Sequence, residues 1–341
     1  MQVSQIGTMF LNCLGMCCSK LTTNTNSSRR QFPTVIEELC HRFSLTDLRK
    51  STDNFDENRV IGGGLFSKVY KGNLQHNGVS DYVVAIKRFN EHGCEAFKKE
   101  IEVLCQLRHP RCVYLIGFCD HQNEKILVYE YMSNGSLDKH LPGGKLSWKK
   151  RVEICIGVAR GLHYLHTGAK RSIFHCILRA STILLDDSME PKLAAFGLSV
   201  QGPRFNPKPQ PKQINGDHII GLVGYMPVEY VMDGTVTDKW DVFSFGLILL
   251  LVVCGMNYLG IVTERGFLKP IEEMIDPNIK GKIAPECWEV FVGIMVRCLE
   301  YEQNERPAIG EAEVELEHAL SAWKGVFFRC SIPSRGALLE G

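Results

Sequence analysis

The chain has 341 residues, and its 39 Lys and Arg nearly balance its 38 Asp and Glu, leaving a net charge of +1. This balance argues against a nucleic-acid partner, which would need a strongly basic surface. The 14 Cys are scattered without Cys-x-x-Cys pairs, so neither a disulfide scaffold nor a zinc site is expected, and a reducing, cytoplasmic compartment is favoured. The length fits one fold of about 270 residues in two lobes, with an arm and a tail.

Residues 1–42 are expected to form a disordered N-terminal arm. The first 36 residues contain no Asp or Glu, and residues 22–28 are all Thr, Asn or Ser. Cys13, Cys17 and Cys18 lie among apolar residues close to Lys20, a setting that favours palmitoylation and attachment to the inner membrane surface. The alternative is a frayed tail whose cysteines are incidental.

A glycine-rich loop follows a predicted strand near residue 60. Gly62, Gly63 and Gly64 match the pattern Gly-x-Gly-x-x-Gly-x-Val of protein kinases, except that Ser67 stands at the third glycine. Such a loop approaches phosphates through its backbone N–H groups. Further along, the run Val-Ala-Ile-Lys at residues 84–87 ends in a lysine that pairs with phosphates, and a helical glutamate follows it. This order of motifs predicts the nucleotide half of a kinase.

The run at residues 175–185 and the run Ala-Ala-Phe-Gly at residues 194–197 occupy the places of the kinase catalytic and metal motifs. Ile177 stands where the catalytic Asp is expected and can accept no proton. Thr182 replaces the Asn that would hold a second metal, and Ala195 replaces the Asp of Asp-Phe-Gly. No catalytic residue of the pattern is therefore intact and no metal ligand is expected, so phosphoryl transfer should fall by several powers of ten.

Three charged residues of the pattern are retained. They are Lys87, Glu100 and Arg179, the last of which replaces the lysine of the catalytic loop and keeps its charge. The regulatory positions are lost instead, because Cys176 replaces the Arg that would pair with a phosphate, and residues 201–224 contain no Ser, Thr or Tyr.

Several further runs identify the resemblance. They are His109-Pro110, residues 115–119, 127–137, 161–166 and 241–246, and Arg306-Pro307. With them the chain resembles the plant receptor-like kinase family related to Pelle and the interleukin-receptor-associated kinases, and most of all its malectin-like receptor (FERONIA-type) branch. The sequence shows neither an ectodomain nor a membrane span, so within the family it resembles a receptor-like cytoplasmic kinase.

The resemblance implies an α+β, bilobal protein-kinase-like fold over residues 43–323. The N-lobe, at about residues 55–131, would hold an antiparallel sheet and one helix, the C-lobe, at about residues 132–323, would be mainly helical, and residues 324–341 would form a short tail. The longest apolar run, residues 242–254, is too short for the roughly 20 residues of a membrane span and is expected to be a buried core helix.

The resemblance also implies a nucleotide site. Tyr129 would be the gatekeeper, and the backbone of Glu130 and Met132 would meet an adenine. The implied cofactor-binding residues are Ile61, Gly62, Gly63, Gly64, Val69, Ala85, Lys87, Glu130, Met132 and Leu184. ATP is expected as an optional ligand with weak or no Mg²⁺ dependence, since the metal ligands are absent. Scaffold positions are kept, with a column of Leu104, Leu115, His175 and Phe196 between the lobes, an anchor at Asp241 and an ion pair of Glu229 with Arg306.

The preferred functional interpretation is a pseudokinase that acts as an allosteric or scaffold partner of an active receptor-like kinase, at the cytoplasmic face of the plasma membrane. The alternative is an active Ser/Thr kinase that uses a metal-poor mechanism through Lys87, Glu100 and Arg179. A degenerate copy without function is the third interpretation. The expected partners are other protein kinases, and no nucleic acid.

Overall fold

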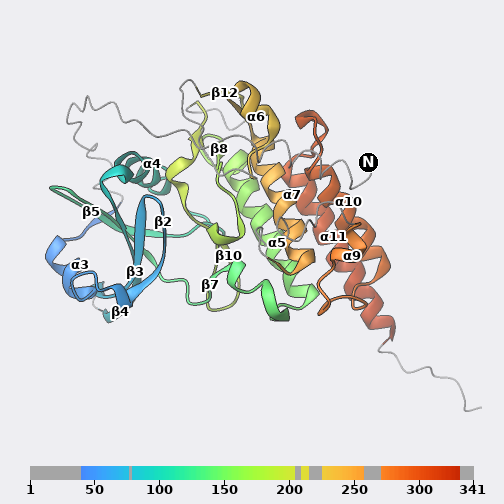
Figure 1. Cartoon of the computed structure of the whole chain (residues 1–341), viewed down its shortest axis with the longest axis horizontal. Coiled ribbons are helices and arrows are strands. Elements are labelled where there is room, and N and C mark those ends of the chain that lie inside the picture. The colour runs from blue at the N-terminus through green and yellow to red at the C-terminus, as the bar shows by residue number, and fades with distance from the viewer. Residues whose placement is uncertain (1–39, 77–78, 204–208, 215–224, 257–269, 331–341) are drawn as a thin grey trace, which may run out of the picture.

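The computed structural model describes residues 40–76, 79–203, 209–214, 225–256 and 270–330. These residues form two lobes, with a β-sheet and its helices beside a bundle of longer helices (Figure 1). The predicted α+β, bilobal fold is confirmed. The predicted acylation sites Cys13, Cys17 and Cys18 and much of the segment 201–224 lie outside the described residues.

The N-lobe is built on a six-stranded sheet with the strand order β1-β5-β6-β4-β3-β2. Its strands are β1 (His41–Arg42), β2 (Val60–Gly64), β3 (Ser67–His76), β4 (Val79–Phe89), β5 (Leu115–His121) and β6 (Glu124–Glu130). Strand side chains alternate between faces. Val84 and Ile86 of β4 are fully buried in a cluster on one face, so Ala85 and Lys87 lie on the other, which faces the second lobe.

Strand β1 corrects the predicted boundary of the arm. It pairs in parallel with β5, His41 opposite Gly117 and Arg42 opposite Phe118, whereas the other pairs of this sheet are antiparallel. The backbones approach so closely that a Cβ on Gly117 would lie 2.1 Å from the His41 carbonyl oxygen. Residues 41 and 42 therefore belong to the sheet, and the boundary predicted at residue 42 was wrong.

Two helices cover opposite faces of this sheet. Helix α3 (Leu45–Ser51) begins at Ser44, whose hydroxyl accepts a hydrogen bond from the Asp47 N–H, and it buries Leu48 against one face. Helix α4 (Cys94–Leu104) buries Phe97 and Ile101 against the other face. Helix α4 is the one helix predicted for residues 55–131, and α3, at residues 45–51, precedes that range.

The C-lobe is mainly helical, as predicted. Its helices are α5 (Trp148–His163), α6 (Val228–Asp233), α7 (Asp238–Cys254), α9 (Ile271–Met274), α10 (Pro285–Cys298) and α11 (Ile309–Cys330). Short strands form three small sheets, which join β7 (Gly135–Ser136) to β9 (Ile183–Leu185) and β10 (Pro191–Leu193), β8 (Ile173–Phe174) to β11 (Val200–Gln201), and β12 (Lys212–Gln213) to β13 (Thr235–Val236). Strands β8 and β9 flank residues 175–182, and β10 and β11 flank residues 194–199.

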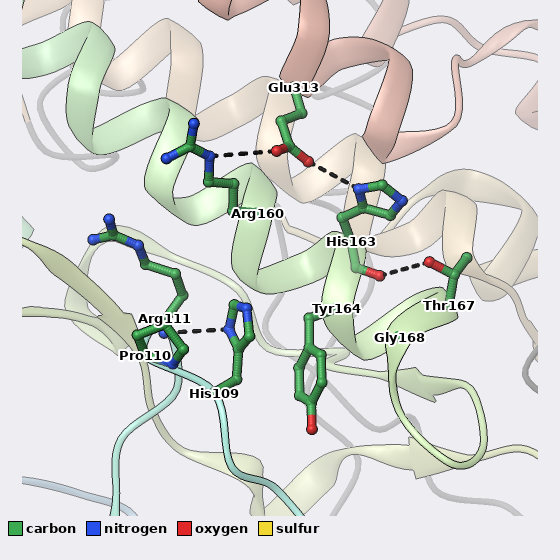
Figure 2. A pocket seen from close by; sticks show the side chains of 9 residues that line it. All are labelled: His109, Pro110, Arg111, Arg160, His163, Tyr164, Thr167, Gly168 and Glu313. Carbon is green, nitrogen blue, oxygen red and sulfur yellow. Dashed lines mark hydrogen bonds and ion pairs between the residues drawn. The ribbon is translucent and has the colours of Figure 1, made fainter.

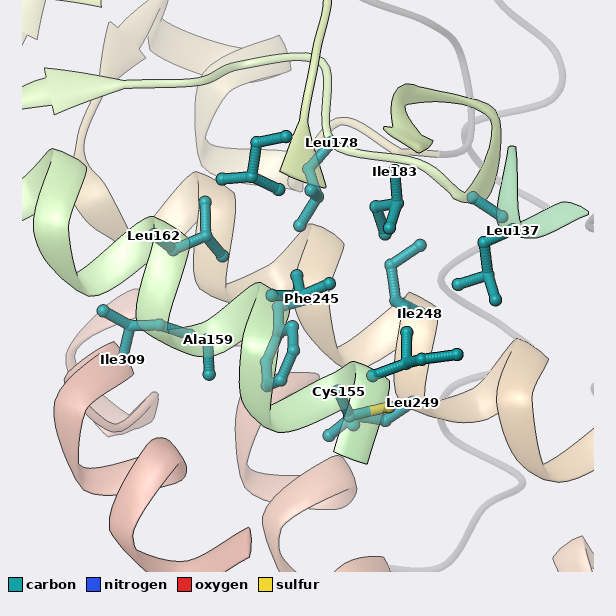
Figure 3. Close-up of a cluster of buried hydrophobic side chains, with 14 of the residues drawn as sticks. Leu137, Cys155, Ala159, Leu162, Leu178, Ile183, Phe245, Ile248, Leu249 and Ile309 are labelled. Atoms are coloured by element: carbon teal, nitrogen blue, oxygen red, sulfur yellow. The ribbon is translucent and has the colours of Figure 1, made fainter. Parts of the chain in front are cut away.

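Helix α7 is the centre of the C-lobe core. Every side chain from Trp240 to Cys254 is buried, which confirms the predicted core helix. Figure 3 shows Phe245 and Ile248 of α7 beside Ala159 and Leu162 of α5 in one apolar cluster. No helix in the described part of the chain is long and apolar enough to cross a membrane.

Candidate active site

A buried triangle of polar side chains joins helix α4 to the sheet. The Lys87 Nζ lies 2.6 Å from Glu100 Oε2, and the Tyr129 hydroxyl donates to Glu100 Oε1 at 2.7 Å. Glu100 is only 1% exposed. Burial, and then the Glu100 carboxylate, raise the pKa of Tyr129 well above 10, so this hydroxyl stays a donor. The predicted pair of Lys87 with Glu100 is thus formed, and the predicted gatekeeper supports it.

Sheet register brings apolar residues to the same face. Val69 lies opposite Lys87 across β3 and β4, and Ala85 lies opposite Tyr129 across β4 and β6. Cross-strand partners point to the same face of a sheet. Ala85 and Leu184 of β9 are half-buried and pack against the same core cluster. These residues provide an apolar surface beside the lysine.

The predicted glycine loop is a hairpin of β2 and β3. A Cβ on Gly63 would lie 2.8 Å from the Ser67 carbonyl oxygen, whereas Cβ atoms on Gly62 and Gly64 would meet nothing within 4 Å. Ser67 pairs with Gly64 and has a negative φ, so this position needs no glycine. The hairpin tip is therefore open on one side, with Ile61 at its start 36% exposed.

The segment after β6 connects the lobes. The Glu130 side chain accepts from the Tyr114 N–H at 2.7 Å and from Lys192 Nζ at 2.7 Å. Within the described residues the Met132 N–H has no hydrogen-bond partner, while its carbonyl accepts from the Gly135 N–H. One backbone donor is thus left for a ligand. The sequence does not predict this contact, because nothing in a single lysine on β10 indicates a partner on β6.

Asp241 of α7 organises the loop that follows β8. Its carboxylate accepts from the backbone N–H of His175 at 2.7 Å and of Cys176 at 2.9 Å, and it lies 2.9 Å from His166 Nε2. Cys176 has a φ of 63°, a left-handed conformation that few residues other than glycine adopt. Asp241 therefore acts as the predicted anchor, and His166 is a further member that sequence analysis missed.

Thr182 closes the same loop from its other end. Its hydroxyl accepts from the Arg179 N–H at 3.1 Å and lies 3.1 Å from the Ile177 carbonyl oxygen and 3.0 Å from that of Arg179. The hydroxyl is thus engaged in backbone hydrogen bonds. The Arg179 Nε is buried without a partner among the described residues. The loop keeps a defined shape although Ile177 contributes no reactive group.

The segment Ala195, Phe196, Gly197 lies against helix α4. Ala195 has φ 69° and ψ 60°, again in the left-handed region. The Phe196 ring packs edge-on against His175 with 5.1 Å between centroids. A Cβ on Gly197 would lie 3.2 Å from Glu100 Oε2. This close packing holds α4 in place, so that Glu100 reaches Lys87.

The predicted column between the lobes is assembled. Leu104, Leu115, His175 and Phe196 are all at most 1% exposed. His175 Nε2 donates to the Ala194 carbonyl oxygen at 3.0 Å, and its other nitrogen accepts from the Ile177 N–H at 3.4 Å, which fixes a neutral ring. Burial lowers the pKa of His175, and the Asp241 carboxylate opposes this only in part.

The C-lobe is stabilised by an ion pair that the sequence also predicted. Arg306 donates to both carboxylate oxygens of Glu229, at 2.5 and 3.0 Å, and its side chain is fully buried. A two-point contact of this kind is stronger than a single charged contact.

Two surface cavities lie away from these residues. One, of about 440 Å³, lies between α5, α11 and the loop after α4, where the His109 and Tyr164 rings stack at 4.3 Å beside Arg160, His163 and Glu313 (Figure 2). The other, of about 580 Å³, is lined by residues of β1, α3 and β5. Neither cavity is lined by Lys87, by Glu100 or by the loops at residues 175–182 and 194–197.

The paired Lys and Glu, the anchored loop and the column between the lobes together form the architecture of a protein kinase. Residues 55–316 match the family described as "Protein tyrosine and serine/threonine kinase". The chain belongs to this family. Its kinase domain places Ala195, Ile177 and Thr182 where the family pattern has its metal ligands and its base.

Similar proteins are plant receptor-like kinases. The chain is 42% identical to the receptor-like protein kinase ANXUR2 of Arabidopsis thaliana over 304 residues, which are 83% of this chain and 34% of that protein. It is 38% identical to the receptor-like protein kinase FERONIA of Arabidopsis thaliana over 332 residues, 92% of this chain and 36% of FERONIA. The chain thus spans about a third of the length of these relatives.

Proposed function

We propose that this protein is a catalytically inactive receptor-like kinase that acts by binding an active one. The observation that carries the proposal is the contrast within one site. Lys87 and Glu100 form their ion pair at 2.6 Å, while Ala195 and Ile177 have no group that can bind a metal or accept a proton. The hydroxyl of Thr182 is engaged in backbone hydrogen bonds. Within the described residues the contacts of the scaffold are formed, whereas the reactive groups of the kinase pattern are absent from positions 177, 182 and 195.

The residues around Lys87 suit a nucleotide but do not suit its metal. Lys87, the glycine hairpin and the Met132 N–H could hold phosphates and adenine, and Val69, Ala85 and Leu184 offer apolar contacts. When bound, ATP would supply negative charge next to Lys87. Ala195 and Thr182, which stand at the metal-ligand positions of the kinase pattern, offer a metal neither a carboxylate nor an amide oxygen. We therefore propose ATP as an optional structural ligand with weak or no Mg²⁺ dependence.

A thermal-shift titration of the full chain with ATP tests this ligand. We expect a rise in Tm that is the same with Mg²⁺ and with EDTA and that disappears in Lys87→Met. The matched control is Lys125→Met, because Lys125 lies in the same sheet, is 17% exposed against 16% for Lys87, and has its own partner, Asp120, at 2.6 Å. Binding that requires Mg²⁺ would contradict the proposed loss of the metal sites.

A phosphoryl-transfer assay tests the loss of catalysis. With radiolabelled ATP, labelling of the protein itself and of a generic substrate should equal that of Lys87→Met. Transfer that the wild type performs and Lys87→Met does not would support the alternative, an active kinase that works through Lys87, Glu100 and Arg179. Loss of catalysis and loss of nucleotide binding are separate outcomes, since a scaffold needs neither catalysis nor a bound nucleotide.

The proposed partner is another receptor-like kinase at the cytoplasmic face of the plasma membrane. The names of the relatives and the intact column between the lobes support a partner that recognises the shape of a kinase. Cys13, Cys17 and Cys18 are the proposed acylation sites. Replacing all three with Ser should move the protein from the membrane fraction to the supernatant. Unchanged fractionation would exclude acylation at these cysteines as the anchor.

A further inference from the structure

Two cysteines far apart in the sequence lie in contact on the N-lobe. The sulfur atoms of Cys40 and Cys105 are 3.1 Å apart, and 65 residues separate the two in the chain. Cys40 directly precedes β1, and Cys105 directly follows α4. They are 4% and 5% exposed and belong to the same core cluster. Among the described cysteines no other two sulfur atoms are in contact.

The fold fixes this contact from both sides. Strand β1 is held against β5 by its pairing with Gly117, where only a glycine leaves room for the His41 carbonyl, and by the hydrogen bond from the Phe43 N–H to the Phe118 carbonyl oxygen at 2.8 Å. The Cys105 N–H donates to the Ile101 carbonyl oxygen at 3.0 Å, which continues the helical geometry of α4. The two thiols are therefore positioned by backbone structure.

We propose that Cys40 and Cys105 form a reversible disulfide, which links the end of the N-terminal arm to the end of helix α4. A bonded pair of sulfur atoms is about 2.05 Å apart, so the two need to approach by only about 1 Å. The link would connect the arm to the helix that carries Glu100. This inference does not rest on the proposed function, because it needs neither nucleotide nor partner.

The electrostatic setting favours a thiolate within this pair, and the direction of the pKa shifts assigns it to Cys40. The hydrogen bond from Cys105 lowers the pKa of Cys40; burial opposes this, and the Arg108 charge adds to it. The same hydrogen bond, followed by burial, raises the pKa of Cys105. The buried thiols of Cys112 and Cys155 lack such a neighbour, and burial raises the pKa of each to about 12. Nucleophilic reactivity belongs to the thiolate form.

Hydrogen peroxide is the proposed oxidant. The Cys40 thiolate attacks one peroxide oxygen, the O–O bond breaks, and hydroxide leaves and is protonated to water. Cys105 then attacks the sulfenic sulfur, its S–H proton leaves with the second water, and the S–S bond forms. The two thiols together lose two electrons and two protons, and one peroxide becomes two waters. Access requires a brief opening of β1, which is a two-residue strand at the sheet edge.

Peptide mapping of the full chain provides the test. Trypsin should release residues 31–42 and residues 100–108, each with one cysteine, Cys40 and Cys105 respectively. After peroxide treatment of the folded protein and alkylation of the remaining thiols, we expect a linked pair with the summed mass of both peptides minus two hydrogens. The link should disappear on reduction. It should be missing in Cys105→Ser and remain in Cys119→Ser, a 2% exposed cysteine without a thiol neighbour.

Two outcomes would overturn the inference. In one, both cysteines are recovered separately, alkylated or overoxidised, after peroxide has modified the half-buried Cys94. In the other, Cys105 is linked to a peptide that lacks Cys40. A second measurement does not depend on any variant. Because the bond closes a 65-residue loop in the unfolded chain, the oxidised wild type should melt about 5 °C above the reduced protein. Equal Tm values would argue against a native disulfide.

Discussion

Glu100→Ala is the most direct test of the polar triangle that joins helix α4 to the sheet of the N-lobe. The substitution leaves the Lys87 ammonium, 16% exposed, and the buried Tyr129 hydroxyl without their shared acceptor. Removing one partner of a buried ion pair typically costs about 3–5 kcal/mol, because the remaining charge has no compensation. For a domain of this size that corresponds to a fall in Tm of about 5–9 °C.

Tyr129→Phe, alone and combined with Glu100→Ala, separates the contributions of the two contacts of Glu100 to the free energy of unfolding. Tyr129→Phe removes one hydrogen bond to a charged group and should cost about 1.5–3 kcal/mol. The double variant should cost less than the sum of the two single variants, because both act on the same carboxylate. Urea unfolding of the four proteins, fitted with a common m-value, measures each free energy. Glu102→Ala is the control, since Glu102 lies exposed on the same helix.

A small and additive loss of stability would contradict this role of Glu100. If Glu100→Ala costs less than about 1 kcal/mol and shows no coupling to Tyr129→Phe, then Glu100 does not reach Lys87 in solution. Helix α4 would then lie away from the segment at Gly197. The contrast between a formed Lys87–Glu100 ion pair and the absent reactive groups at Ala195 and Ile177 would no longer hold.

Three further predictions concern the loops. Burial lowers the pKa of His175 below its usual 6.5, so the unfolded chain binds a proton at this residue more readily than the folded one. The contribution of His175 to the free energy of unfolding is therefore fully present above pH 6.5 and is lost as the pH falls below that value. In urea unfolding, His175→Phe should reduce the dependence of the free energy of unfolding on pH. Gly63→Ala should lower Tm by several degrees, since its Cβ would meet the Ser67 carbonyl at 2.8 Å, while Gly64→Ala should leave Tm within about a degree of wild type. Thr182→Val should cost about 1–3 kcal/mol, measured in the same way, because it leaves a backbone N–H unpaired; a loss below about 0.5 kcal/mol would contradict this role.

The sequence predicted the parts of the site that follow from motifs. The pair of Lys87 with Glu100 and the anchor at Asp241 could be expected because each motif fixes a position in a known architecture. The hydrogen bond from Tyr129 to Glu100 and the approach of His166 to Asp241 could not, because they depend on side-chain orientation between elements 29 and 75 residues apart. Motif spacing contains no such information.

The boundary of the arm was missed for a related reason. Residues 41 and 42 have no hydrophobic alternation of their own, and a two-residue strand forms only because β5 is already in place. The glycine that makes the approach feasible, Gly117, is 76 residues away in sequence from His41, so the local pattern near residue 40 reads as part of the polar arm. The composition therefore predicts disorder at residues 41 and 42, although their pairing with β5 orders them.

Ala195 adopts a left-handed backbone conformation at the position where the kinase pattern has Asp. An alanine with φ 69° and ψ 60° costs about 1–2 kcal/mol, and Asp tolerates this region better because its side chain can bond locally. Ala195 gains no such bond, yet the conformation persists because Phe196 packs on His175 and Gly197 fits closely against Glu100. The packing of its neighbours, and not the residue at 195, therefore determines the shape of this segment. A kinase domain with Ala195 at this position therefore keeps the arrangement around Lys87 and Glu100.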